Sequence, residues 1–255
     1  MGEVILGELL RAVDAGDAAA VKVIALRAPL DGIADHESPV TGLHPRTSPL
    51  LLATVLGRTA IARILLDHGA RLDIRWIDAS TPLHQAAKRD RLALARLLLA
   101  RGADLEGRDE LGETPLFGAA RWASTAMVRA LLDAGADARA RNEAGATVLH
   151  GVVPHDQGLL AKTRVVLDAG ADIDARDAKG RAPLHHAVID DLPALARLLV
   201  ERGADRGAVD GAGRRPVDYA GEALRDLVEP GATPGAARSG GASSRSRRRP
   251  TARRT

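Results

Sequence analysis

The chain has 255 residues, no cysteine, and 36 Lys and Arg against 33 Asp and Glu, which gives a formal net charge of +3 at pH 7. Without cysteine the sequence excludes disulfide bonds, thiolate nucleophiles and cysteine-ligated metals. No apolar stretch reaches the roughly 20 residues of a membrane-spanning helix, and the N-terminal segment lacks the basic start of a signal peptide. We therefore predict a cytoplasmic protein with no membrane contact.

Two landmarks recur along the chain and set its period. One is a proline, replaced once by valine, at Pro49, Pro82, Pro115, Val148, Pro183 and Pro216. The other is a Gly-Ala pair that begins at Gly69, Gly102, Gly135, Gly170 and Gly203. The proline series advances by 33, 33, 33, 35 and 33 residues, and the Gly-Ala series by 33, 33, 35 and 33. A fixed period of this size indicates a stacked solenoid, in which each unit buries its apolar face only against its neighbours and no single pocket is enclosed.

The first predicted elements form an N-terminal cap. Residues 9–29 are similar to the later units but lack their opening motif, as expected of a capping unit. Residues 30–46 are longer than the loops between later units and carry Pro39 and Pro45, so we expect an extended loop there.

The segment from Thr81 to Glu113 is the best-formed unit and predicts a pair of helices. Thr81 is a suitable N-cap, and Pro82 follows at the first helical position, where its missing N–H has no cost. The first helix has a narrow apolar face formed by Leu83, Ala86 and Ala87. The apolar positions of the second helix are Leu94, Leu97 and Leu98.

Glycine and polar residues end this unit. Gly102 is expected to terminate the second helix, because a glycine adopts the left-handed conformation at little steric cost. The segment from Asp104 to Glu113 is polar, with turn residues Gly107 and Gly112, and is predicted to project as a hairpin-like finger.

The repeated motif resembles the ankyrin repeat, whose signature is T-P-L-H-x-A-A followed by L-L-x-x-G-A-D. The matching segments are SPLLLAT from Ser48, TPLHQAA from Thr81, TPLFGAA from Thr114, TVLHGVV from Thr147, APLHHAV from Ala182 and a closing RPVDYAG from Arg215. The resemblance covers about residues 9–228. It implies an all-α ankyrin-repeat solenoid of stacked helix-turn-helix units with projecting finger loops.

This resemblance divides the chain into three parts. Residues 1–46 are predicted to hold an N-terminal capping repeat and a long loop, and residues 47–229 to hold five full ankyrin repeats and a truncated C-terminal repeat. Residues 230–255 form an Arg-rich tail that we expect to be disordered, because it is rich in Pro, Gly, Ser and Ala.

One unit departs from the pattern. The fourth full unit contains two additional residues around Pro154 to Gly158. Its Lys162 takes the place of an apolar residue found in the other units at Ile61, Leu94, Met127 and Leu195. We expect the second helix of this unit to be shifted or shortened. Such a defect is either a weak joint in the stack or a bulge that a partner recognises.

The charge of the chain is divided at Glu229. The seven arginines and absent acidic residues of the tail give it a net +7, whereas the preceding residues carry −4. Such a tail could bind nucleic acid or an acidic surface weakly, or could only aid solubility. It contains no aromatic residue on which a base could stack.

Metal binding and catalysis have little support in the sequence. The resemblance implies structural hydrogen bonds for the motif histidines His84, His150 and His185. Neighbouring units lie about 10 Å apart, whereas zinc ligands lie about 2.1 Å from the metal, so equivalent histidines cannot share an ion. Motifs such as G-x-S-x-G, the phosphate loop and H-E-x-x-H are absent from the chain. We predict no metal, no cofactor and no enzymatic activity.

Recognition is expected at positions that vary while the framework repeats, namely the fingers and the exposed ends of the first helices. The predicted partner-binding residues are Trp76, Ile77, Asp78, Lys88, Arg89, Arg108, Glu110, Leu111, Arg121 and Trp122. Charged residues of later fingers, including Arg141, Arg176, Lys179 and Arg181, are expected to form a solvated rim.

The sequence therefore predicts a non-catalytic protein-protein interaction module, an adaptor, scaffold or inhibitor. It would act as a monomer and bind an unidentified protein partner through finger loops and the concave helix surface. The alternative is attachment to nucleic acid or an acidic surface through the Arg-rich tail.

Overall fold

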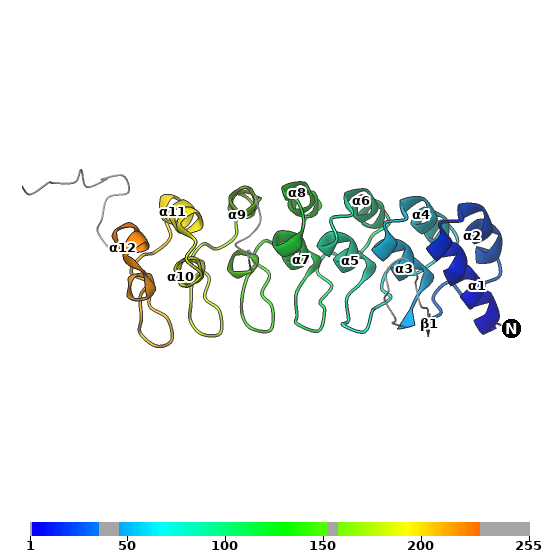
Figure 1. The fold of residues 1–255 in the computed structure, drawn as a ribbon, viewed down its shortest axis with the longest axis horizontal. Coiled ribbons are helices and arrows are strands. Elements are labelled where there is room, and N and C mark those ends of the chain that lie inside the picture. The colour runs from blue at the N-terminus through cyan, green and yellow to red at the C-terminus, as the bar shows by residue number, and fades with distance from the viewer. Residues whose placement is uncertain (1, 36–45, 152–157, 230–255) are drawn as a thin grey trace, which may run out of the picture.

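The computed structural model describes residues 2–35, 46–151 and 158–229. Helix pairs follow one another in chain order and form a single elongated stack of two helical layers (Figure 1). The first helices of the pairs lie in one layer and the second helices in the other. Loops project like fingers from the first-helix layer. The predicted solenoid with projecting finger loops is confirmed.

Each pair consists of a first and a second helix. The pairs are α1 (Gly2–Ala15) with α2 (Ala18–Ala25), α3 (Pro49–Leu56) with α4 (Thr59–Asp67), α5 (Pro82–Lys88) with α6 (Leu92–Ala100), α7 (Pro115–Trp122) with α8 (Thr125–Asp133), the 3-10 helix η1 (Val148–His150) with α9 (Leu159–Asp168), α10 (Pro183–Ile189) with α11 (Pro193–Glu201), and the 3-10 helix η2 (Pro216–Tyr219) with α12 (Glu222–Val228).

The N-terminal pair is longer than the sequence indicated, because α1 begins at Gly2 rather than near Leu9. In the predicted long loop, β1 (Ala34–Asp35) pairs antiparallel with β2 (Arg46–Thr47). The loop prolines Pro39 and Pro45 lie outside the described residues, as does the tail 230–255. The proposed division of the chain at residues 46 and 229 stays a prediction.

Helix ends follow the local signals. The Ser48 side chain accepts a hydrogen bond from the backbone N–H of Leu51 at 3.3 Å at the start of α3. Proline occupies the first turn of α3, α5, α7 and α10. Gly102, after α6, has φ of +84°, and Gly135, after α8, has φ of +101°. Each glycine supplies the left-handed residue that lets the chain leave its helix.

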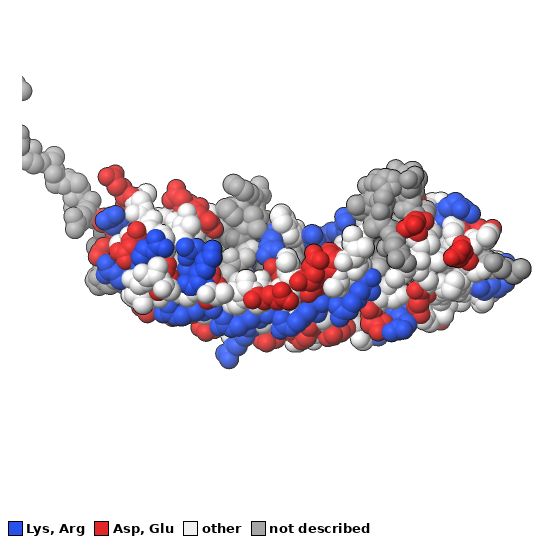
Figure 2. All heavy atoms as spheres, turned by 90° about the horizontal axis from the view of Figure 1, so that it is seen from below, with Lys and Arg blue, Asp and Glu red and all other residues white. Residues whose placement is uncertain are grey.

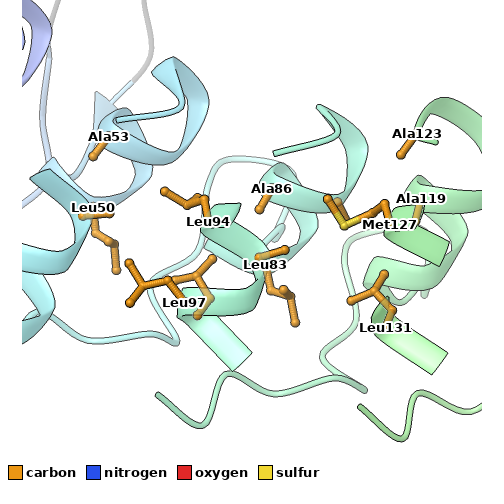
Figure 3. Packing of buried hydrophobic residues seen from close by; sticks show 14 of the residues in the cluster. Leu50, Ala53, Leu83, Ala86, Leu94, Leu97, Ala119, Ala123, Met127 and Leu131 are labelled. Atoms are coloured by element: carbon orange, nitrogen blue, oxygen red, sulfur yellow. The ribbon is translucent and has the colours of Figure 1, made fainter. Parts of the chain in front are cut away.

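The core consists of apolar side chains buried between adjacent helix pairs (Figure 3). Ala53, Ala86 and Ala119 are fully buried, and they occupy equivalent places in α3, α5 and α7. Their small side chains let neighbouring first helices approach closely. Leu94 and Leu131 of the second-helix layer are also fully buried. Each helix pair is therefore completed by the next.

The second helix of the fourth unit was expected to be shifted or shortened. This helix, α9, has ten residues and is not shortened. The two-residue insertion precedes Leu159, so it shifts the position of the helix along the chain without removing residues from it. The described part of the first helix is instead reduced to η1, and residues 152–157 lie outside the described residues.

Lys162 replaces the apolar residue of α9 without leaving the core. Its side chain is 1% exposed, and its Nζ donates a hydrogen bond to the Ala123 carbonyl at 3.1 Å. The long aliphatic stem can fill the place of a leucine while the amine reaches a backbone acceptor. The buried apolar residues divide at this unit into two clusters, one running from Leu6 to Val166 and one from Leu159 to Val228.

Gly135 and Gly118 provide a matched test of whether a positive φ angle requires glycine after a helix. Gly135→Ala should lower the free energy of unfolding by about 1 kcal/mol, because φ is positive there although an added Cβ would meet no atom within 4 Å. Gly118→Ala should instead raise it by about 0.5 to 1 kcal/mol, because Gly118 lies inside α7 and its Cβ would make an ordinary 3.5 Å contact with Lys88. Urea titrations followed by circular dichroism measure the free energy of unfolding of both variants. Equal effects would contradict the difference in backbone conformation between the two glycines.

Candidate interaction surface

The tips of the fingers are held by side-chain hydrogen bonds. The Asp109 Oδ1 atom accepts from the backbone N–H groups of Leu111 and Glu113, both at 2.9 Å. Asp177 and Asp210 form the same pair of bonds in later fingers. These bonds satisfy the backbone of the turn internally, so the tips can present outward-facing side chains in a defined position.

Neighbouring fingers are joined to one another through backbone groups. The N–H of Glu110 donates to the Asp78 carbonyl at 3.0 Å, and that of Glu143 donates to the Leu111 carbonyl at 3.0 Å. Similar bonds join Ala178 to Ala144 and Gly211 to Lys179. The finger tips therefore form one continuous edge.

Four arginines strengthen this edge. The Nη1 atom of Arg75 donates to the Ala79 carbonyl of its own finger at 2.9 Å and to the Arg108 carbonyl of the next finger at 2.6 Å. Arg108, Arg141 and Arg176 repeat the arrangement, each bonding to its own finger and to the next. Figure 2, which views the finger side, shows a line of Lys and Arg atoms along the stack. Arg108, predicted to contact a partner, thus has a structural role.

The motif histidines join each first helix to the following finger, as the resemblance implied. Nδ1 of His84 accepts from the backbone N–H of Thr81 at 3.2 Å, and Nε2 lies 3.0 Å from the Glu113 carbonyl. His150 and His185 make the equivalent contacts to the Arg181 and Arg214 carbonyls. Since Nδ1 accepts, the proton resides on Nε2, which donates to the carbonyl.

These histidines make stability depend on pH. Burial lowers the pKa of His84, His150 and His185, although the hydrogen bond to a carbonyl opposes the shift. Their pKa values are higher in the unfolded chain, near 6.5, so acidification below about pH 6.5 protonates the unfolded state first and lowers stability.

His84→Gln removes one such group while keeping a side chain that forms hydrogen bonds. We expect the free energy of unfolding to fall less steeply for the variant than for the unaltered chain between about pH 6.5 and pH 5, because one proton fewer is taken up on unfolding. Urea titrations at several pH values measure the difference. Identical slopes would show that His84 does not titrate differently in the two states.

A first hollow lies between the fingers and first helices around α5 and α7. We call it the N-terminal hollow. It has a volume of about 170 Å³ and is lined by Asp78, Ser80, His84, Gln85, Lys88, Asp109, Glu110, Leu111, Glu113, Thr114, Gly118, Arg121 and Trp122. Six of the predicted partner-binding residues meet here: Asp78, Lys88, Glu110, Leu111, Arg121 and Trp122.

The wall of the N-terminal hollow contains an ion pair that the sequence did not reveal. Glu113 is buried, and its carboxylate accepts two hydrogen bonds from the Arg121 guanidinium, at 3.0 and 2.9 Å. Asn142 of the next finger donates to the same carboxylate at 3.3 Å. Beside this pair, the Trp122 side chain is 57% exposed and Leu111 is 55% exposed. The hollow therefore combines a neutralised ion pair with exposed apolar surface.

The remaining predicted residues lie outside the hollow. Ile77 is 76% exposed at a finger tip, whereas Trp76 is half-buried in the same finger. Arg89 is exposed at the end of α5, and its Nε donates to the Gln85 side chain at 3.3 Å. Arg108 belongs to the arginine edge described above.

Two further hollows continue along the stack. The central hollow, of about 270 Å³, is lined by Phe117, Arg121, Asn142, Ala144, Ala146, Thr147, His150, Gly151, Asp177, Ala178, Lys179 and His186. The C-terminal hollow is lined by Asp177, Ala178, Lys179, Gly180, Arg181, Asp210, Gly211, Ala212 and Arg214. Adjacent hollows share lining residues, so they form a continuous row that we call the finger groove. Sequence reasoning placed Lys179 and Arg181 on a solvated rim and missed these hollows.

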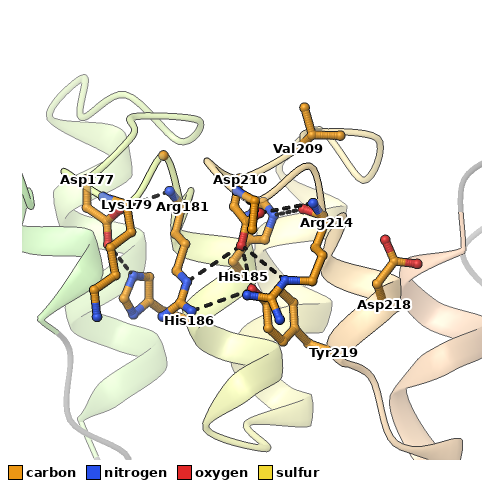
Figure 4. Close-up of polar contacts among 12 residues, drawn as sticks. Asp177, Lys179, Arg181, His185, His186, Val209, Asp210, Arg214, Asp218 and Tyr219 are labelled. Carbon is orange, nitrogen blue, oxygen red and sulfur yellow. Dashed lines mark hydrogen bonds and ion pairs between the residues drawn. The ribbon is translucent and has the colours of Figure 1, made fainter.

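The C-terminal hollow contains a network around Asp210 (Figure 4). The Tyr219 hydroxyl donates to Oδ2 of Asp210 at 2.5 Å, and the guanidinium of Arg214 lies over the tyrosine ring at 4.6 Å from its centre. The hydrogen bond from Tyr219, followed by the backbone N–H groups of Arg214 and Ala212, lowers the pKa of Asp210 to about 2. Asp177 likewise accepts from Nε2 of His186, at 2.9 Å.

The described ranges 2–35, 46–151 and 158–229 contain no group of three or more His, Cys, Asp or Glu that could hold a metal ion. No helix in those ranges has both the length and the apolar character needed to cross a membrane.

Comparisons with known proteins match most of the chain. A family model described as "Ankyrin repeats (3 copies)" matches residues 9–109 and 83–177, and one described as "Ankyrin repeat" matches residues 179–211. Among solved structures, the chain is similar to the ankyrin repeat domain of Bcl-3, described as a unique member of the IκB protein family. The two are 26% identical with a TM-score of 0.73, over 87% of this chain and 97% of the other. No curated protein gives a significant match.

Proposed function

Since the chain belongs to the ankyrin-repeat family and its stack is a protein-protein interaction module, we propose that it is a non-catalytic adaptor or inhibitor that holds a protein partner in the finger groove. The centre of contact is the N-terminal hollow together with the neighbouring Trp76, Ile77, Arg89 and Arg108.

The observation that carries this proposal is exposed apolar surface in and beside the N-terminal hollow, where three large apolar side chains lie close to charged groups. Ile77, Leu111 and Trp122 are all more than half exposed, and Leu111 and Trp122 line the same hollow. Exposed apolar groups surrounded by polar ones are typical of protein interaction sites, and tryptophan and arginine often contribute most of the binding energy.

The pairing of charges in the hollow favours recognition over catalysis. Its buried carboxylate, Glu113, is held in a two-point ion pair with Arg121, and its histidine, His84, is engaged through both ring nitrogens. A general acid or base needs a group that can exchange a proton with substrate. These groups instead form a fixed surface.

Capture of a partner protein tests whether the binding site lies at the N-terminal hollow. Trp122→Ala and Arg89→Glu should each abolish retention of a partner protein from an extract of the source cells by the immobilised full chain, because they remove an exposed aromatic contact and reverse a charge beside the hollow. The matched control is Arg96→Glu, which reverses an exposed charge on α6 in the other helical layer. The circular dichroism melt should stay unchanged in all three. Full retention by both groove variants would refute the location.

The Arg-rich tail carries the alternative function, attachment to nucleic acid or an acidic surface. It is favoured by the separation of charge, with seven arginines and no acidic residue after Glu229. If all seven contacted single-stranded phosphates, the affinity would fall with salt with a log-log slope of at most about −5. Replacing the tail arginines by glutamine distinguishes the two functions, because groove binding should persist and a salt-sensitive RNA or DNA shift should vanish. Monomeric state and location in the cytoplasm stay predictions.

A further inference from the structure

The two ends of the finger groove differ in available charge. The N-terminal hollow contains four carboxylates, from Asp78, Asp109, Glu110 and Glu113, and two cations, from Lys88 and Arg121. Glu113 and Arg121 neutralise each other in their two-point pair. The charge left for a ligand is therefore acidic, with three carboxylates against one lysine.

Those three carboxylates keep oxygen atoms available. Asp78 and Asp109 use Oδ1 for the hydrogen bonds of their own finger turns. Within the described part of the chain, the Oδ2 atoms of both residues and the carboxylate of Glu110 make no hydrogen bond, and Glu110 is exposed. The hollow can therefore accept hydrogen bonds from a cationic side chain without breaking bonds of its own.

The C-terminal hollow has the opposite character. Its two carboxylates are engaged, because Asp177 accepts from His186 and Asp210 accepts from Tyr219 and two backbone N–H groups. Asp210 also pairs with two cations of this hollow, because its Oδ2 lies 3.8 Å from Nε of Arg181 and 3.9 Å from Nε of Arg214. The accessible cations are Lys179, which is exposed, and Arg214, whose side chain stays 51% exposed beside Asp210. An acidic ligand group would meet these cations at this end.

The central hollow, which lies between the two charged hollows, has a partly apolar wall. The central hollow has Phe117, Ala144, Ala146 and Gly151 in its lining, so small and apolar groups form part of its wall. A space-filling view from the finger side shows a red acidic patch near the middle of the stack and blue clusters toward the C-terminal end (Figure 2).

We propose that the finger groove binds a segment of the partner protein whose charges are segregated along its length. A lysine or arginine enters the N-terminal hollow beside Trp122, small or apolar residues cross the central hollow, and an acidic side chain meets Lys179 and Arg214. This inference rests on the proposed function and names the chemistry of its ligand.

The spacing of the units sets the length of such a segment. Stacked helices lie about 10 Å apart, and the two charged hollows are separated by about three units, or about 30 Å. An extended chain covers about 3.3 Å per residue. About nine residues should therefore separate the basic and acidic groups of an extended ligand.

Selection from a random 16-residue peptide library displayed on phage, with the immobilised full chain as target, tests the inference. Enriched sequences should carry a basic residue and an acidic residue separated by about nine positions. Synthetic peptides of the enriched sequences should bind at least about tenfold better, by fluorescence anisotropy, than peptides of the same composition with the charges interleaved.

Charge reversal at one end provides the sharper measurement. Glu110→Lys should weaken the selected peptides by about tenfold, and replacing the basic residue of the peptide by glutamate should restore binding to that variant. The matched control is Asp133→Lys, an exposed reversal on α8 in the other helical layer, which should leave binding unchanged.

Every other outcome overturns the inference. It fails if enriched peptides lack segregated charge, if none is enriched, or if Glu110→Lys binds them as well as the unaltered chain. It also fails if peptides bind only after Arg247, Arg248 and Arg249 are replaced by glutamine, since the tail would then be the occupant. The proposed function fails separately, when Trp122→Ala and Arg89→Glu leave partner capture intact.

Discussion

Burial of apolar side chains between adjacent helix pairs is the interaction on which the rest of this molecule depends. Fully buried alanines in successive first helices let neighbours approach, and fully buried leucines of the second-helix layer fill the space beside them. Because each interface is shared only by neighbours, the stack grows in one direction and exposes a long surface. Recognition must therefore take place on that surface.

The hydrogen bonds that order the fingers decide which finger residues can face a partner. Each arginine of the edge bonds to its own finger and to the next, and each motif histidine joins a helix to the following finger. These groups hold the fingers in a row. Ile77, Glu110 and Leu111 contribute no side chain to that network and are exposed on the fingers.

The fourth unit shows how a stack accommodates a departure from its pattern. A lysine enters the core there because its stem is apolar and its amine reaches the Ala123 carbonyl. The first helix is a single 3-10 turn in its described part, and the buried apolar clusters divide at this unit. Apolar packing between neighbouring units is thus least continuous at the fourth unit.

The sequence by itself determined the period, the helix starts at Ser48 and Thr81, the glycine that ends α6, and the binding role of the fold, because these follow from local hydrogen bonds and repeated apolar spacing. It also located six residues of the N-terminal hollow, since variable finger positions recur at known places in the unit. Only the tertiary structure decided that Arg108 joins two fingers while Glu110 faces outward, and that Arg121 neutralises Glu113. The physical reason is that the charge available to a ligand depends on which groups pair across neighbouring units, and residues about one period apart meet only when the units stack.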